Sequence, residues 1–360
     1  MTSDEPGSSV TMGTTNPRRH AFITRLLPEP APTLLREAFV LRGNLEDVPL
    51  SRTDLLAGVR GAEAIVCTLT DPIDAGVMDS AGPQLRVIST CAVGFDNIDV
   101  AAATERHVFV ATTPDVLTDA TAEPTWALIL ATARRVVEGD RLVKSGGFHG
   151  WSPSMLLGME LRGRTLGVVG MGRIGTAVAR IANGFGMAVV YVRRSGPLPA
   201  ESVPLGARWR YATCLEDLLK VADIVSLHVP LSDGTRHLLG RRELECMRPG
   251  SILINTSRGP VVDEQALVER IRSGALRGAG LDVYEAEPNL TAGLVDLPNV
   301  VLLPHLGSAT VETRRRMAEF AALNAIAAFT DGNLHAVNAE ALRLRGFGSD
   351  SSGDGVPSQR

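Results

Sequence analysis

The sequence predicts an α/β protein in which one domain of parallel strands and helices is inserted into another. Short apolar strands alternate with helical segments from about residue 20 onward, a pattern typical of parallel sheets. Near mid-chain, an apolar run at Thr165–Val169 leads into Gly-x-Gly-x-x-Gly at Gly170–Gly175, and a helical pattern follows at Thr176–Phe185. Because this strand–turn–helix unit begins in the middle of the chain, we predict that it opens a second domain that interrupts the first.

The glycine turn predicts a Rossmann dinucleotide-binding domain, and the alternative is a purely structural turn. Gly170 permits the tight turn, Gly172 lets the backbone approach a pyrophosphate, and Gly175 lets helix and strand pack closely. The N-terminus of the following helix offers N–H groups and a favourable dipole to phosphates. We expect Arg173 and Ile174, which lie within this turn, to contact the cofactor as well.

Composition excludes several other classes of protein. The chain of 360 residues is 44% hydrophobic and 21% charged, which is ordinary for a soluble globular protein. Its net charge of -4 argues against a nucleic-acid partner. No apolar run is long enough to cross a membrane and no secretory signal is visible, so we expect a cytoplasmic protein. The four cysteines are scattered, which predicts free thiols in a reducing compartment and no metal site.

The first domain is predicted to be flavodoxin-like and split between both ends of the chain, at residues 20–117 and 306–343. Five strands are expected, at Ala21–Thr24, Ala38–Leu41, Ala64–Cys67, Arg86–Ser89 and Val108–Ala111. Helices are expected between them at Thr33–Glu37, Arg52–Val59 and Ala75–Ala81, and a final long helix, Thr310–Phe329, is expected to return to this domain. The tails, residues 1–19 and 344–360, are rich in small and polar residues and are predicted to be disordered.

The second domain, residues 118–305, is predicted to be the dinucleotide-binding domain. It begins with a long helix at Asp119–Val137 and an irregular stretch at Leu142–Leu161. Six strands follow, the number of a complete doubly wound domain: Thr165–Val169, Ala188–Val192, Ile224–His228, Ser251–Asn255, Ala279–Val283 and Val300–Leu303. The clearest helices between them are Leu215–Val221 and Asp263–Ser273.

The end of the second of these strands indicates which dinucleotide is bound. An NAD site usually places an acidic residue there for the ribose hydroxyls, but this chain has Arg193, Arg194 and Ser195. Two guanidinium groups and a hydroxyl suit a 2′-phosphate by charge and geometry. We therefore predict that NADPH is preferred and that NADH is possible; the alternative is a pair of solvated surface arginines.

Three later strand ends carry residues suited to acid–base chemistry. Arg258 follows one strand, Asp282 lies near the end of the next, and Glu287 and His305 lie on neighbouring loops. Ligands of such sheets bind at this carboxyl edge. An arginine can grip a substrate carboxylate, and a carboxylate–imidazole pair can protonate a carbonyl oxygen. Taken singly, a lone Glu or His is more often structural, and a surface salt bridge is the alternative for Arg258.

These motifs resemble those of the D-isomer-specific 2-hydroxyacid dehydrogenase family over about residues 20–343. The matching segments are Gly170–Gly175, Asn255–Gly259, Asp282–Pro288 and Pro304–Thr310. The resemblance implies that Arg258 orients the substrate, that Glu287 pairs with the catalytic His305, and that Asp282 contacts the nicotinamide amide. It also implies that the backbone at Val93–Gly94 holds the substrate carboxylate and that Leu69 lines the pocket. Further cofactor contacts are expected from Val229, Pro230, Thr256, Gly307 and Ser308.

Two segments resemble the glyoxylate/hydroxypyruvate reductase branch, Thr113–Glu123 and Gly146–Trp151. In that branch a tryptophan from the partner subunit can reach the active site, so Trp151 is expected either to do so in a homodimer or to be a core or interface residue. Pro124 departs from the family pattern and is expected in the first turn of its helix, where proline is tolerated.

The resulting hypothesis is NADPH-dependent reduction of small 2-oxo acids, glyoxylate and hydroxypyruvate first. Two alternatives stay open. One is a reductase of a bulkier acid, such as 2-ketogluconate or a phenylpyruvate-like acid. The other is a nucleotide-sensing protein resembling the corepressors that share this fold.

Overall fold

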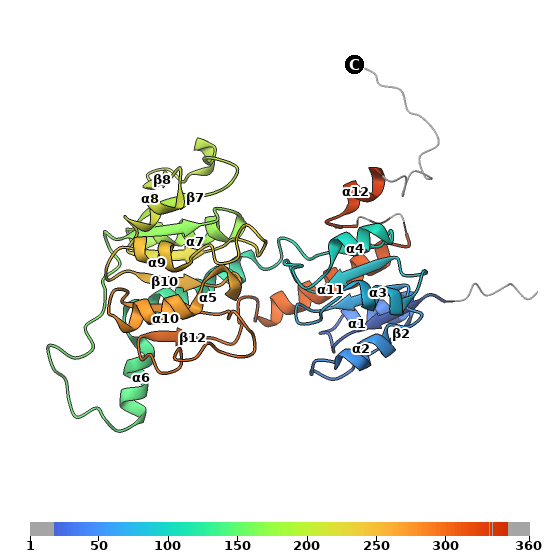
Figure 1. Cartoon of the computed structure of the whole chain (residues 1–360), viewed down its shortest axis with the longest axis horizontal. Helices are drawn as coiled ribbons and strands as arrows, with labels where there is room; N and C mark the ends of the chain where they lie inside the picture. The colour runs from blue at the N-terminus through green and yellow to red at the C-terminus, as the bar shows by residue number, and fades with distance from the viewer. Residues whose placement is uncertain (1–17, 331, 333, 345–360) are drawn as a thin grey trace, which may run out of the picture. The chain divides into compact units, whose positions relative to one another are not determined.

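A computed structural model describes residues 18–330, 332 and 334–344 (Figure 1). Most of the two tails that were expected to be disordered, residues 1–17 and 345–360, lies outside the described residues. Contacts divide the chain into two compact units. Among the described residues, the first unit comprises 18–113 and 318–344, and the second comprises 114–317. The second unit is therefore an insertion in the chain of the first.

The first unit is built on a parallel sheet of five strands in the order β2-β1-β3-β4-β5, which is the flavodoxin-like order. The strands are β1 (His20–Ile23), β2 (Val40–Gly43), β3 (Ala64–Cys67), β4 (Val87–Thr90) and β5 (Phe109–Ala111). The helices are α1 (Ala31–Ala38), α2 (Arg52–Gly58), α3 (Ala75–Ala81), α4 (Val100–Glu105) and α12 (Ala339–Leu344). Helix α4 is an addition to the predicted elements; the Asp99 side chain caps it by accepting the Ala102 N–H.

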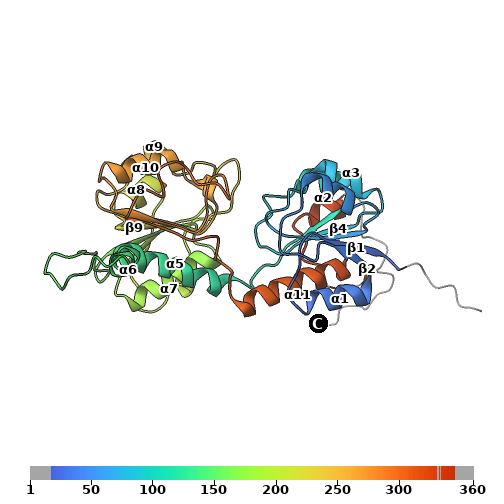
Figure 2. The same ribbon diagram turned by 90° about the horizontal axis from the view of Figure 1, so that it is seen from below.

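The C-terminal helix α11 (Val311–Ala327) returns to this sheet. Its small residues Ala318, Ala321 and Ala325 are fully buried. Ser89 of β4 donates a hydrogen bond to the Ala321 carbonyl at 2.8 Å, and the Asn324 amide donates to the Thr112 carbonyl at 2.9 Å. Chain segments more than 200 residues apart thus form one core. Figure 2 shows α1 and α11 on one face of the sheet and α2 and α3 on the other.

The second unit is built on a seven-stranded sheet in the order β12-β11-β10-β9-β6-β7-β8, and every pairing in it is parallel. The strands are β6 (Thr165–Val169), β7 (Ala188–Val192), β8 (Trp209–Tyr211), β9 (Ile224–Leu227), β10 (Ile252–Asn255), β11 (Gly278–Leu281) and β12 (Val300–Leu302). The prediction of six strands was wrong because it missed β8. That edge strand has three residues, one of them the exposed Arg210, so it shows no apolar run.

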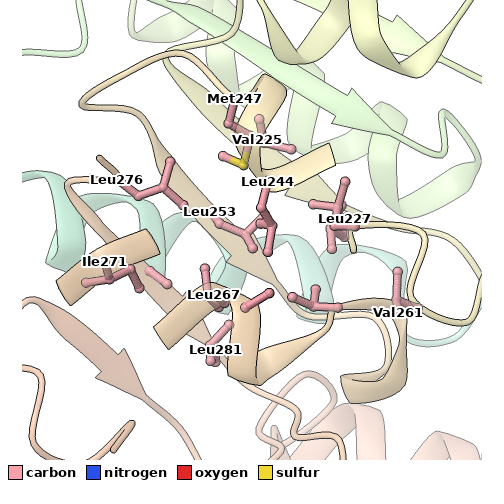
Figure 3. Close-up of a cluster of buried hydrophobic side chains, with 14 of the residues drawn as sticks. Val225, Leu227, Leu244, Met247, Leu253, Val261, Leu267, Ile271, Leu276 and Leu281 are labelled. Atoms are coloured by element: carbon pink, nitrogen blue, oxygen red, sulfur yellow. The ribbon is translucent and has the colours of Figure 1, made fainter. Parts of the chain in front are cut away.

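Helices cover both faces of this sheet, as a doubly wound fold requires. They are α5 (Thr118–Ala133), α6 (Val136–Lys144), α7 (Arg173–Gly184), α8 (Leu215–Leu219), α9 (Arg241–Cys246) and α10 (Glu264–Arg272), with short 3-10 turns η1 (Ala200–Ser202) and η2 (Gly259–Val261). In Figure 2, α8, α9 and α10 lie on one face and α5 and α7 on the other. Figure 3 shows how Leu244, Leu267 and Ile271 from the helices, with Met247 directly after α9, meet the strand residue Leu253 in one buried cluster.

The long helix predicted at Asp119–Val137 is interrupted. Helix α5 ends at Ala133, Arg135 adopts a left-handed backbone with φ of 55°, and α6 then runs into the stretch expected to be irregular. Pro124 lies in the second turn of α5, not the first, because the helix begins at Thr118. Proline there removes one N–H from the helix ladder, and the burial of Trp126, Leu128 and Ile129 holds the helix in place.

Within the described residues, no helix has both the length and the apolar character needed to cross a membrane.

Candidate active site

The glycine turn between β6 and α7 has the geometry that phosphate binding requires. Gly170 has a positive φ of 96°, and a side chain there would press against the His228 carbonyl at 2.7 Å. A Cβ at Gly175 would collide with the Gly170 carbonyl, so helix and turn pack directly on each other. Gly172 differs, because a Cβ there would meet open space. No side chain caps α7 at Gly172, which leaves its N-terminus suited to an anion.

The residues around this turn follow neighbouring strands. Val229 and Pro230 come directly after β9, and Val229 packs beside Gly170. Ile174 is in the first turn of α7. Arg173 forms an ion pair at 2.5 Å with Asp115, although both side chains are largely exposed. An exposed pair of this kind is weak and salt-sensitive, so Asp115 is a competitor of any phosphate for Arg173.

Arg193 and Arg194 lie immediately after β7. Arg193 Nε donates a 2.8 Å hydrogen bond to Ser195 Oγ. Arg194 and Ser195 are exposed and Arg193 is partly exposed. The structure therefore places all three residues in one turn at the carboxyl edge of the sheet. The hydroxyl orients one guanidinium group.

The loop after β10 is braced by a buried amide. The Asn255 side chain is 1% exposed, donates to the Arg258 carbonyl at 2.9 Å and accepts the Ser257 N–H at 3.0 Å. This Asx turn fixes the backbone on both sides of Ser257. Thr256 is nine-tenths buried, and its hydroxyl lies 2.9 Å from the Thr125 hydroxyl on α5. Thr125 could not be identified from the sequence, because nothing around a threonine inside a helix indicates a hydrogen-bond partner far along the chain.

Asp282, just after β11, is 1% exposed. Its backbone N–H donates to the Asn255 carbonyl at 2.9 Å, and its Oδ1 accepts the Leu306 N–H at 2.6 Å. Burial raises the pKa of Asp282, an effect opposed by the Leu306 hydrogen bond and the His305 charge. Oδ2 has no hydrogen-bond partner among the described residues and lies beside Gly307. A buried acceptor without a donor is costly, and an amide N–H of a ligand would satisfy it.

Glu287 and His305 form the pair expected from the sequence. His305 Nδ1 lies 3.1 Å from Glu287 Oε2, and Glu287 Oε1 accepts the Tyr284 N–H at 2.9 Å. Burial alone would raise the pKa of Glu287, but its hydrogen bond to His305 and the charges of His305 and Arg258 outweigh burial and lower it. The carboxylate is therefore ionised at neutral pH and holds the imidazole by Nδ1, which leaves Nε2 for a substrate.

The remaining residues of this edge lie on the loops after β11 and β12. The His305 N–H donates to the Asp282 carbonyl at 2.9 Å, which ties the β12 loop to the β11 loop. Gly307 and Ser308 are both buried in the same loop. Asp282, Glu287 and His305 are thus joined by hydrogen bonds, and the charge of Arg258 reaches Glu287.

In the first unit, Leu69 and Val93–Gly94 follow β3 and β4. Asp71, which the sequence analysis missed, fixes the first of these loops: its Oδ2 accepts the Thr68 N–H at 2.7 Å and the Thr24 hydroxyl at 2.6 Å. The Asn97 side chain then links the two loops by donating to the Thr68 carbonyl at 3.0 Å. Val93 is 37% exposed and Gly94 is partly exposed.

Trp151 does not lie on the loops that follow β10, β11 and β12. It follows α6 and is 82% exposed, and the neighbouring Phe148 and Leu157 are also at least half exposed. Among the described residues, no group of three or more His, Cys, Asp or Glu side chains could hold a metal ion.

The fold and the carboxyl-edge residues define a dinucleotide-binding oxidoreductase. The family model for "D-isomer specific 2-hydroxyacid dehydrogenase, NAD binding domain" matches residues 126–307. A glyoxylate reductase of Aeropyrum pernix is 48% identical over 335 residues, which is 91% of this chain and 98% of that protein. A glyoxylate reductase of Thermococcus gammatolerans is 46% identical over 90% of this chain and 97% of its own length.

A solved structure supports the same classification. The NADPH-dependent glyoxylate/hydroxypyruvate reductase of Sinorhizobium meliloti, in complex with NADP and malonate, superposes with a TM-score of 0.76 at 32% identity, covering 90% of this chain and 98% of that one. The chain belongs to the D-isomer-specific 2-hydroxyacid dehydrogenase family, in its glyoxylate reductase branch.

Proposed function

We propose that the protein reduces small 2-oxo acids, glyoxylate and hydroxypyruvate first, with NADPH as the preferred cofactor and NADH as a possible one. The observation that carries this proposal is the 3.1 Å contact between His305 and Glu287 beside the buried Asp282. Two relatives are named glyoxylate reductases, which supports glyoxylate, and the Sinorhizobium reductase is named for both glyoxylate and hydroxypyruvate.

The bound cofactor would supply a hydride to the carbonyl carbon of the substrate. His305, held at Nδ1 by Glu287, carries a proton on Nε2 and gives it to the carbonyl oxygen. Arg258 binds the substrate carboxylate and polarises the carbonyl. In the first unit, the N–H groups around Val93–Gly94 bind the same carboxylate, with Leu69 lining the pocket. We propose the functional division accordingly: a substrate domain at residues 20–117 and 306–343 and a cofactor domain at 118–305.

For the cofactor, we propose that the pyrophosphate lies on the turn Gly170–Gly175 and the 2′-phosphate on Arg193, Arg194 and Ser195. The orphaned Oδ2 of Asp282 fits the carboxamide N–H₂ of a nicotinamide. Val229, Pro230, Thr256, Gly307 and Ser308 are proposed to line the path between these points. The Sinorhizobium reductase, which is named for NADPH and was solved with NADP, supports the choice of cofactor.

The test is a panel of glyoxylate, hydroxypyruvate, 2-ketogluconate and phenylpyruvate, each assayed with NADPH and with NADH by absorbance at about 340 nm, where reduced nicotinamide absorbs. The highest kcat/KM is expected for glyoxylate or hydroxypyruvate with NADPH. A higher kcat/KM for a bulkier acid would replace the substrate assignment. Tight cofactor binding without turnover of any acid would favour a nucleotide-sensing protein.

We also propose a cytoplasmic homodimer, for which the exposed apolar side chains after α6 support an interface. Trp151, Phe148 and Leu157 are each at least half exposed, and exposed apolar side chains that lie together mark interaction surfaces. The W151A variant, examined by light scattering and by its KM for glyoxylate, tests this surface. A monomer at micromolar concentration would contradict the homodimer.

A further inference from the structure

Glu264, in the first turn of α10, is a buried carboxylate to which the proposed reaction gives no role. The residue is 2% exposed. Its Oε1 accepts the Glu285 N–H at 2.8 Å, and its Oε2 accepts the Thr291 hydroxyl at 2.5 Å. Burial raises the pKa of Glu264 above its ordinary value, and these two hydrogen bonds offset that effect only in part. A carboxylate buried in this way is retained only where its partners are well placed, and its removal leaves donors unsatisfied.

The two residues that donate hydrogen bonds to Glu264 lie on either side of Glu287 in the sequence. Glu285 and Thr291 lie before and after it on the loop that follows β11. Two successive N–H groups of that loop have different acceptors: the Tyr284 N–H donates to Glu287 itself, at 2.9 Å, and the Glu285 N–H donates to Glu264, at 2.8 Å. Tyr284, whose N–H orients Glu287, is thus held by Glu264 through the next peptide group, Tyr284–Glu285.

Glu264 is also linked to the segment of chain that carries Arg258. Only five residues lie between Arg258 and Glu264, and η2 (Gly259–Val261) makes up three of them. The backbone at Gly259 lies directly against the Tyr284–Glu285 peptide, where a Cβ would overlap the Tyr284 carbonyl group. Glu264 therefore fastens the segment carrying Arg258 to the segment carrying Glu287.

A second, exposed connection joins the same segments. The His237 N–H donates to the Pro260 carbonyl at 2.8 Å, and His237 Nε2 lies 2.6 Å from Glu285 Oε1. The His237 side chain is 44% exposed, so this contact contributes less than the buried one.

We propose that Glu264 is a positioning residue for the reaction and that His237 has a lesser supporting role. Glu264 sets where Glu287 lies relative to Arg258. Because Glu287 holds His305, Glu264 also sets where His305 lies. The proposal rests on the roles assigned above to those three residues. Glu264 itself touches neither substrate nor cofactor.

The primary test compares Glu264→Ala with Glu264→Gln in the full chain. In the alanine variant the 284–291 loop loses its buried acceptor, so kcat is expected to fall about 10- to 100-fold, the effect of a displacement near 1 Å. The cofactor Kd is expected to stay within about threefold, because the glycine turn is untouched. Glutamine should restore kcat to within about threefold, since its oxygen can accept the Glu285 N–H and its amide can donate to Thr291.

Hydrogen–deuterium exchange supplies a readout that does not depend on turnover. Glu264→Ala should speed exchange in the peptide spanning residues 284–291 and leave the peptide spanning 165–175 unchanged. The matched control is Glu269→Ala on the same helix, which removes the 2.6 Å surface pair with Arg241 and leaves the Glu264 contacts in place. It should leave both kcat and exchange at the wild-type level.

A kcat of Glu264→Ala within threefold of wild type, or unchanged exchange in residues 284–291, would overturn the proposal. If the alanine variant does not fold, His237→Asn tests the same connection from the surface, and asparagine tolerates the positive φ of 49° at this position. It should lower kcat about two- to fivefold, and an unaltered kcat would count against the connection. A wild-type protein inactive on every 2-oxo acid would refute the proposed function, while the exchange experiment would still decide whether Glu264 holds the loop.

Discussion

Glu287 Oε2 lies 3.1 Å from His305 Nδ1, although the two residues are on loops that follow different strands, β11 and β12. Parallel pairing of those strands brings the loops to one edge. The contact fixes which imidazole nitrogen is used, because Nδ1 is occupied by the carboxylate.

The substitution His305→Gln is expected to remove the proton donor. We expect kcat to fall by about 10²- to 10⁴-fold, the range for loss of a general acid, while NADPH binding changes little. Stopped-flow or steady-state absorbance would give kcat, and fluorescence titration the Kd. Near-normal turnover would take the acid role away from His305.

The substitution Glu287→Gln should change how stability depends on pH. The pKa of Glu287 is lowered from its ordinary value of 4.5, so its contribution to stability is fully present above the unfolded pKa and is lost as pH falls through the folded pKa. The difference in free energy of unfolding between wild type and variant should therefore be constant from about pH 6 to 8 and shrink below 4.5. Urea denaturation at several pH values would show this, and a difference that grows toward acid pH would contradict it.

Replacing both Arg193 and Arg194 with alanine should separate the two cofactors. Each charge-assisted hydrogen bond to a phosphate contributes about 1.5–3 kcal/mol, so the Kd for NADPH should rise at least about tenfold and that for NADH much less. Arg208→Ala is the matched control, because Arg208 binds the Gly186 carbonyl at the opposite end of β7. Equal losses for both cofactors would remove the 2′-phosphate from this turn.

The two glycines Gly172 and Gly175 should respond oppositely to alanine. A Cβ at Gly172 meets open space and the backbone there, with φ of -88°, is accessible to alanine, so the thermal midpoint should stay near wild type while cofactor affinity falls. At Gly175 a Cβ collides with the Gly170 carbonyl, so the free energy of unfolding should fall by about 1–3 kcal/mol. Calorimetry with and without NADPH distinguishes these outcomes, and full affinity in Gly172→Ala would place the pyrophosphate elsewhere.

The βα alternation and the glycine turn could be predicted from the sequence, because both depend on local signals. These signals are apolar runs and residues with special backbone freedom. Prediction from the sequence failed for β8, whose three residues are stabilised by pairing with β7 and not by their own composition. It also failed at Arg135, where a left-handed residue divides a helix that has no glycine or proline at the break.

Positions of Arg258, Asp282, Glu287 and His305 at strand ends could be predicted for the same reason, since strand ends are local features. The residues that hold these side chains and loops in place could not be predicted. Thr125, Asp71 and Glu264 act through partners 131, 47 and 21 residues away, and nothing in the residues flanking them indicates those partners.

The hydrogen bonds among Asp282, Glu287 and His305 all lie within residues 114–317. Substitutions in the loops of the first unit, around Leu69 and Val93, leave every one of these bonds intact. Mutation can therefore reshape the part proposed to recognise the acid without rebuilding the proton-donating pair, a modularity that favours divergence of substrate preference among descendants of one ancestral chain.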